Sequence, residues 1–397
     1  MTQRSRRQPP LLTLLQAIAQ GRADVPWDTF EAAQIQWAVE AGFGPLLFSL
    51  MQGHPDAMAS PLWPLLHGAH VTAQFLISEQ LEAIGELLEA CAGRLPPLTL
   101  LKGISICRQH YPAPHLRLMR DIDILVDEAA RPAVESLLVM LGYRQRSRSQ
   151  LPAAFFDTYH HSMPFFHAQR GVWVEVHRGL FPPTSPLGLD PVFSRAHVAT
   201  QLRPSALHGS AVMRLSDELQ LVYIAAHWAQ SFQVIGGMVA LMDTIYLLRN
   251  TTATLDWERI GAWLDGSVAA PHVSLMLTYL ARHQVIEIDP QVLQTLCVRQ
   301  RAFGTMNLRL LHAVVDRYMV GGRPVGHRLS PRKLHLLWES LLSPDPALHN
   351  LMRAFLKLLL PTRWHPGLAR LQHLLGRVAG HEKFSTVRQH RHSADPQ

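Results

Sequence analysis

The amino-acid sequence predicts an α+β fold, in which a small mixed β-sheet with helices lies between helical regions at both ends of the chain. Two apolar runs of β character, at residues 98–101 and 121–126, predict two strands. Two further short runs, at residues 163–167 and 172–177, are separated by a glycine-containing turn, which is typical of a hairpin. The segments before and after repeat their apolar residues at helical spacing, so we expect the sheet to occupy the middle of the chain.

The same patterns predict the order of the domains. Apolar pairs at helical spacing begin near Leu11 and continue to about Ala92, where Pro96-Pro97 interrupts them. A later helical region, with a capping pattern at Ser216, continues to a break at Gly321-Gly322. We therefore expect disordered residues 1–10, an N-terminal helical region 11–92, a sheet domain 93–190, a helical domain 191–320, basic C-terminal helices 321–380 and a disordered tail 381–397.

Composition favours a folded protein with a large core, because 48% of the residues are hydrophobic and only 17% are charged. The net charge is +7, and the positive charge is concentrated after residue 298. A basic amphipathic segment at residues 351–360 suits either packing onto the body or binding to an acidic partner or a membrane surface. Three cysteines without ligand-like spacing and the lack of a long apolar run predict a cytoplasmic protein without a transmembrane segment.

Asp121 and Asp123 are the first candidates for chemistry. They alternate with Ile122 and Ile124, so in a strand both carboxylates project from one face while the isoleucines project into a core. Two carboxylates on one face suit Mg²⁺, a hard cation that takes oxygen ligands. The alternative is the solvent face of an edge strand, because this short pattern is common by chance.

Lys102 and Gly103 end the first apolar run, ahead of a predicted helix. Glycine permits a close approach of the backbone to a phosphate, and a following helix offers N–H groups to an anion. Lys102 is the only lysine before Lys333, in a chain whose other early cations are arginines. A phosphate ligand explains this choice, and so does drift in an arginine-biased composition.

Together these residues resemble the uncharacterised nucleotidyltransferase family of the polymerase-β-like superfamily. The resemblance covers roughly residues 90–265 and rests on the sequence LKG, a Tyr-Pro pair, an arginine before the D-h-D strand, a Gly-Tyr pair, a strand with a third carboxylate, and two helical residues. In this chain they are Lys102-Gly103, Tyr111-Pro112, Arg117, residues 121–126, Gly142-Tyr143, residues 174–177, His227 and Asp243. Ile104 stands where the superfamily usually has a small hydroxyl residue, and the first hydroxyl is that of Ser105.

The resemblance implies a nucleotidyltransferase palm and a set of site residues. Asp121, Asp123 and Glu175 would bind Mg²⁺ or Mn²⁺ and act in catalysis. Residues Lys102, Gly103, Ser105 and Arg117 would bind the triphosphate. His177, on the same strand face as Glu175, suits a contact with phosphate or substrate and equally a structural hydrogen bond. Asp243 lies in an apolar run, where pairing with His227 or an arginine is one interpretation and support of the site is another.

The implied reaction transfers a nucleoside monophosphate from a nucleoside triphosphate, with ATP expected, to a hydroxyl or phosphate group of an acceptor. A small molecule, a peptide or a protein fits as acceptor, whereas the chain has no recognisable nucleic-acid-reading motif, so nucleic acid is possible but less favoured. Two alternatives stay open. One is phosphate transfer on the same scaffold, and the other is a non-catalytic protein that senses nucleotide or binds peptide or RNA. The histidines are scattered without ligand spacing and predict no dedicated metal site.

Overall fold

The computed structural model describes residues 10–359 except 23–24, 26, 55, 148–152, 158, 231–236, 252, 297–303, 321–329, 332–333, 336–337 and 339–344. The expected disorder of residues 1–9 and 381–397 lies outside the described residues, as does most of the basic segment 321–380. Within the described part of the chain, no helix is long and apolar enough to cross a membrane.

Within the residues just given, seven strands form one mixed sheet, which confirms the predicted fold class. The order across the sheet is β3-β4-β5-β2-β1-β7-β6, with parallel pairing between β2 and β5 and between β1 and β7. The strands are β1 (Thr99–Leu100), β2 (Ile122–Leu125), β3 (Arg144–Gln145), β4 (Phe165–His167), β5 (Val172–His177), β6 (Leu202–Leu207) and β7 (Ser210–Leu215). The sheet thus continues past residue 190, because the β6–β7 hairpin adds to the edge beside β1.

Helices account for most of the remaining described chain. The α-helices are α1 (Pro10–Gln20), α2 (Ala32–Glu40), α3 (Gly44–Met51), α4 (Trp63–Cys91), α5 (Lys102–Gln109), α6 (Arg131–Met140), α7 (Ala153–Phe156), α8 (Arg195–Thr200), α9 (Asp217–Gln230), α10 (Gly237–Thr251), α11 (Trp257–Leu264), α12 (Ala270–Arg282), α13 (Pro290–Leu296), α15 (Thr305–Val314) and α17 (Pro346–Leu359). Shorter turns of helix are η1 (Trp27–Thr29), η2 (Ala57–Ala59), η3 (Pro114–Leu116), η4 (Pro191–Phe193) and the π-helical η5 (Val315–Val320).

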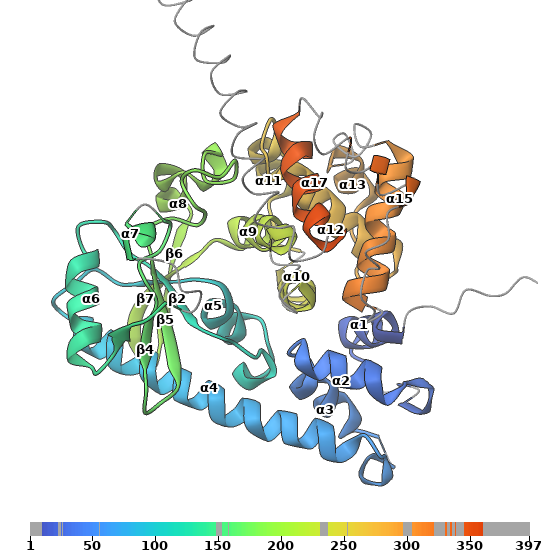
Figure 1. Cartoon of the computed structure of the whole chain (residues 1–397), viewed down its shortest axis with the longest axis horizontal. Coiled ribbons are helices and arrows are strands. Elements are labelled where there is room, and N and C mark those ends of the chain that lie inside the picture. The colour runs from blue at the N-terminus through green and yellow to red at the C-terminus, as the bar shows by residue number, and fades with distance from the viewer. Residues whose placement is uncertain are drawn as a thin grey trace, which may run out of the picture.

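The described residues pack around two hydrophobic cores. Figure 1 shows the sheet with α6 on one side, the helices α9–α17 and α1–α3 on the other, and α4 running along both parts. One core packs the inner face of the sheet, including Ile122, Ile124, Val174 and Val176, against the C-terminal half of α4. The other core joins the N-terminal helices to α9–α17. Successive side chains of a strand project from opposite faces, so Asp123 and its neighbour Glu175 lie on the other face of the sheet. Asp123 lines a pocket there together with residues of α5 and α9.

Candidate functional site

Asp123 and Glu175 lie side by side on neighbouring parallel strands. The register pairs Asp123 of β2 with Glu175 of β5, and Leu125 with His177, so the predicted third carboxylate stands beside the D-h-D strand. Asp121 precedes β2, at a bend, and lines the same pocket as Asp123. Paired residues of neighbouring strands project from the same face of a sheet, so Asp123 and Glu175 share one face. Asp121 lies just before the strand.

Among the described residues, Asp123, Glu175 and His177 could hold a metal ion, because each offers one donor atom within 4.8 Å of the others. Asp121, a ligand predicted from the sequence, is not part of this group. His177 Nε2 lies 2.7 Å from Asp123 Oδ1 and 3.6 Å from Glu175 Oε2. His161, bridged to His177 through the backbone, places its Nε2 3.7 Å from Glu175 Oε2. Two carboxylates and an imidazole form a donor set that fits a divalent cation such as Mg²⁺ or Mn²⁺.

Lys102 brings a positive charge to this acidic group. It is the first residue of α5, and its φ of 47° lies in the left-handed region, which a non-glycine residue occupies only under constraint from its surroundings. From there its Nζ donates a 2.8 Å hydrogen bond to Asp123 Oδ1. The same carboxylate oxygen therefore contacts both Lys102 and His177.

The charges of this group shift one another's pKa values. Burial alone would raise the pKa of Asp123, but Lys102 and His177 hold it well below its ordinary value. Burial and Lys102 lower the pKa of His177, but Asp123 and Glu175 outweigh them and raise it. The pKa of Lys102 lies well above its ordinary value because Asp123 and other nearby charges outweigh burial. The site thus keeps two carboxylates ionised by surrounding them with cations of the chain.

Arg117 and Asp243 form a buried ion pair between the segment before β2 and helix α10. Arg117 donates through Nε at 3.1 Å and through Nη2 at 2.8 Å to the two oxygens of Asp243. Tyr111 adds a 2.8 Å hydrogen bond from its hydroxyl to Asp243 Oδ1. Asp243 therefore pairs with an arginine, one of the partners considered from the sequence, and Arg117 lines the pocket while engaged by Asp243.

Gly103 lies where a side chain has no room. A Cβ at this position would stand 2.7 Å from Met119 Cγ and 2.8 Å from Arg117 Nη1. The glycine therefore permits close packing of α5 against the segment before β2, and it also lines the pocket. Ser105, predicted to bind phosphate, is buried within α5, and its hydroxyl accepts a 2.8 Å hydrogen bond from Gln109 Nε2.

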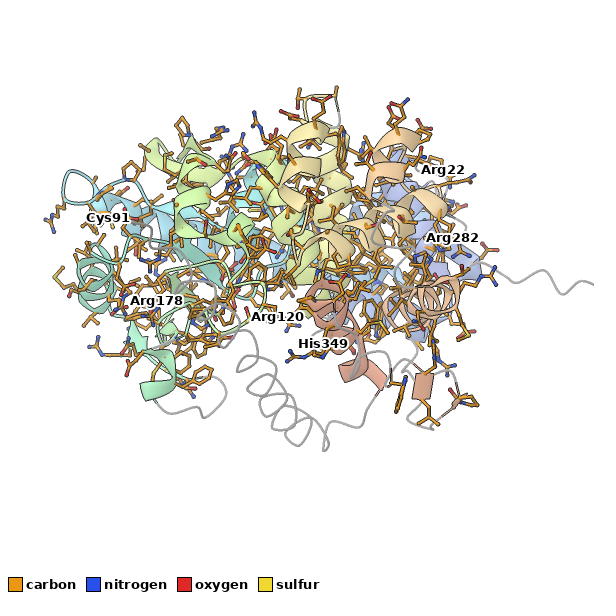
Figure 2. The ribbon with its side chains drawn as sticks, turned by 90° about the horizontal axis from the view of Figure 1, so that it is seen from above. Arg22, Cys91, Arg120, Arg178, Arg282 and His349 are labelled. Atoms are coloured by element: carbon orange, nitrogen blue, oxygen red, sulfur yellow. The ribbon has the colours of Figure 1, made fainter. Side chains whose placement is uncertain are left out.

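A pocket of about 310 Å³ connects the acidic group to the helices. Figure 2 places Arg120, one of its lining residues, in the middle of the molecule, where sheet and helices meet. Lining residues come from four parts of the chain, namely α5 (Lys102, Gly103, Ile106), the β2 segment (Arg117, Leu118, Arg120, Asp121, Asp123), α9 (Gln220, Tyr223, Ile224, His227) and α10 (Val239, Ala240, Asp243).

Sequence reasoning missed Gln220 and Tyr223 in α9 and His161 ahead of β4. The signal for the first two was available, because residues 220, 223, 224 and 227 share one helix face, with polar side chains inside an apolar run. No local pattern marks His161, whose place follows from its backbone bridge to His177.

Comparison with known proteins agrees with this geometry. A family model described as "Uncharacterised nucleotidyltransferase" matches residues 27–284, which is more than half of the chain and includes all the pocket residues. Neither the curated proteins nor the solved structures that were searched include a match. Because the family model covers more than half of the chain, the chain belongs to the uncharacterised nucleotidyltransferase family.

Proposed function

We propose that the protein transfers a nucleoside monophosphate from a nucleoside triphosphate, with ATP as the expected donor, to an acceptor, with release of pyrophosphate. The observation that carries this proposal is the pairing of Asp123 with Glu175 on adjacent strands, at the end of a pocket that also holds Asp121, Lys102 and Arg120. The family match supports the reaction class. The acceptor we propose is a hydroxyl group of a small molecule, a peptide or a protein.

Asp123, Glu175 and His177 would hold Mg²⁺ or Mn²⁺, and Asp121, which lines the same pocket as Asp123, would be a further ligand. When bound, such an ion would neutralise charge on the triphosphate and on the leaving pyrophosphate. Glu175 is the better candidate for accepting the proton of the attacking hydroxyl, because Asp123 is already engaged by Lys102 and His177. In this arrangement Asp123 orients the site, and Glu175, beside it on β5, acts as the base.

Lys102 and Arg120 would contact the triphosphate. The Lys102 ammonium lies 2.8 Å from an acidic oxygen and can exchange that partner for a phosphate oxygen as the ligand enters. Arg120 is exposed at the pocket. Arg117 would act indirectly, by holding the pocket wall through Asp243. We do not extend the proposal to Ser105, since its hydroxyl is buried and bonded to Gln109.

The test is pyrophosphate release from each of the four nucleoside triphosphates, with Mg²⁺ or Mn²⁺ and a fractionated cell extract as the source of acceptor. We expect Asp123→Asn to lower the rate about a thousandfold, because charge neutralisation by the metal contributes several kcal/mol to the barrier. Asp127→Asn, an exposed carboxylate just beyond β2, is the matched control and should leave the rate unchanged.

Mass spectrometry of the labelled acceptor separates this reaction from its rivals. A nucleotidyl adduct with pyrophosphate release supports the proposal, whereas a gain of one phosphate would assign a kinase-like transfer on the same scaffold. Nucleotide binding without any transfer would indicate a sensing role. Equal rates for wild type and Asp123→Asn would show that the carboxylates do not act in the reaction.

A further inference from the structure

Two buried side chains of α9 line the pocket, and each carries one polar atom that has no hydrogen-bond partner within the described part of the chain. Gln220 is 2% exposed and Tyr223 is 1% exposed, and both line the pocket. Among the described residues, Gln220 Nε2 and the Tyr223 hydroxyl have no hydrogen-bond partner. Donors of this kind destabilise a folded protein unless something supplies an acceptor, so their presence in a pocket calls for an explanation.

The pocket has a charged end, where Lys102 contacts Asp123 and where the neighbouring residues Arg120 and Asp121 also line the wall. The other lining residues include the apolar side chains Ile106, Leu118, Ile224, Val239 and Ala240. His227 also lines the pocket, and burial lowers its pKa to about 3, so its imidazole is neutral. The remaining charged pair, Arg117 and Asp243, is internally neutralised. A ligand that matches these features has an anionic part and a neutral, largely apolar part that accepts hydrogen bonds.

We infer that Gln220 and Tyr223 form the nucleoside subsite of the nucleotidyltransferase, donating hydrogen bonds to the ribose and base of the triphosphate. The inference rests on the proposed function, which places the phosphates at the charged end. Both residues project from one face of α9, three positions apart, so one elongated ligand can contact both.

The two residues divide the nucleoside between them. The Tyr223 side chain interacts electrostatically with Lys102, Asp123 and Glu175, which places it toward the phosphates and assigns it to the ribose. Gln220 lies one helical turn nearer the start of α9 and is assigned to the base. Burial raises the pKa of Tyr223 above its ordinary value, so its hydroxyl stays protonated and able to donate.

The experiment compares a nucleotide with its phosphates alone. Calorimetry with Mn²⁺ measures binding of α,β-methylene nucleoside triphosphates, which resist transfer, and of inorganic tripolyphosphate. We expect Gln220→Met and Tyr223→Phe each to weaken nucleotide binding about tenfold, as for a lost hydrogen bond, and to leave tripolyphosphate binding unchanged. Without ligand, neither variant should melt below the wild type, because each removes an unpaired buried donor.

Tyr143→Phe is the matched control. Its hydroxyl is likewise buried and has no hydrogen-bond partner in the described ranges, but it belongs to the core between the sheet and α4. The control should keep the melting temperature at or above that of the wild type and leave nucleotide binding unchanged. If Gln220→Met and Tyr223→Phe lose nucleotide affinity but keep their melting temperature, the two residues act in ligand binding and not in stabilising the fold.

Three results would overturn the inference. If the α9 variants bind nucleotide as tightly as the wild type, the residues do not contact the nucleoside, although pyrophosphate release could still support the proposed reaction. If tripolyphosphate binding falls equally, they contact phosphates or shape the pocket. If the wild type binds neither probe, the proposed function and the inference both fail.

Discussion

At the scale of single residues, Lys102 and His177 hold the acidic group through contacts with one oxygen of Asp123. Asp123 Oδ1 accepts from Lys102 Nζ at 2.8 Å and contacts His177 Nε2 at 2.7 Å. Burying these charges costs desolvation energy, which is offset only while each charge contacts a partner of opposite sign. Removing one partner therefore leaves a buried charge without compensation. The stability of the protein should therefore depend on the protonation of His177.

The expected pH dependence follows from the raised pKa of His177. A group whose pKa is raised by folding contributes stability that is full below its unfolded value of 6.5 and is lost as the pH rises through the folded value. In urea unfolding with EDTA, the stability advantage of the wild type over His177→Gln should therefore be larger at about pH 6 than at about pH 9.

His272 provides a control of opposite sign. It is fully buried in α12, and desolvation lowers its pKa to about 4. Its neutral form is the one that folding favours, so the advantage of the wild type over His272→Gln should shrink as the pH falls below 6.5. A pH-independent difference for His177→Gln would mean that His177 has the same pKa in the folded and unfolded chains.

Local patterns predict only part of the residue-scale detail. Asp123 and Glu175 follow from strand alternation, because every second side chain of a strand shares a face. The roles of Gly103 and Ser105 do not follow from such a pattern. The first depends on Met119 and Arg117 packing over the glycine, and the second on which face of α5 is buried. Both are decided by tertiary contacts.

At the scale of elements, the Arg117–Asp243 pair fixes helix α10 to the segment before β2. The partners are 126 residues apart in the chain, so no sequence spacing could reveal the pairing. The sequence did show that a lone acid in an apolar run needs a partner, and the structure supplies Arg117 and Tyr111. The β4–β5 hairpin and strand β2 could be predicted from the sequence, because alternating side chains and turn residues are local patterns.

A double-mutant cycle tests this connection. Asp243→Asn should lower the free energy of unfolding by about 3 kcal/mol, because it leaves the buried Arg117 charge unpaired. The double variant Arg117→Met/Asp243→Leu should recover much of that loss, since no buried charge remains. Urea unfolding measures these values and those of the single variants Arg117→Met and Asp243→Leu, which complete the cycle. Strictly additive losses would show that the two residues contribute independently.

At the scale of the whole molecule, the pocket joins two separately packed cores. The sheet side provides Lys102 and Asp123, and the helices α9 and α10 provide Gln220, Tyr223 and Ala240. Helical periodicity predicts the helices individually but does not predict which of them face the sheet, because that depends on contacts between distant segments. A ligand in the pocket would contact both parts at once.

Ligand binding should therefore stabilise the whole fold. A ligand that binds only the folded state adds about 2.7 kcal/mol at a hundred times its dissociation constant, enough to raise the melting temperature by a few degrees. We expect this rise with Mn²⁺ and an α,β-methylene nucleotide together, and its loss with EDTA or in Asp123→Asn. Mn²⁺ without nucleotide should give a smaller rise, because it contacts the acidic group on the sheet but not α9 or α10. An equal rise with Mn²⁺ alone would show that the nucleotide contributes no contact that bridges the two cores.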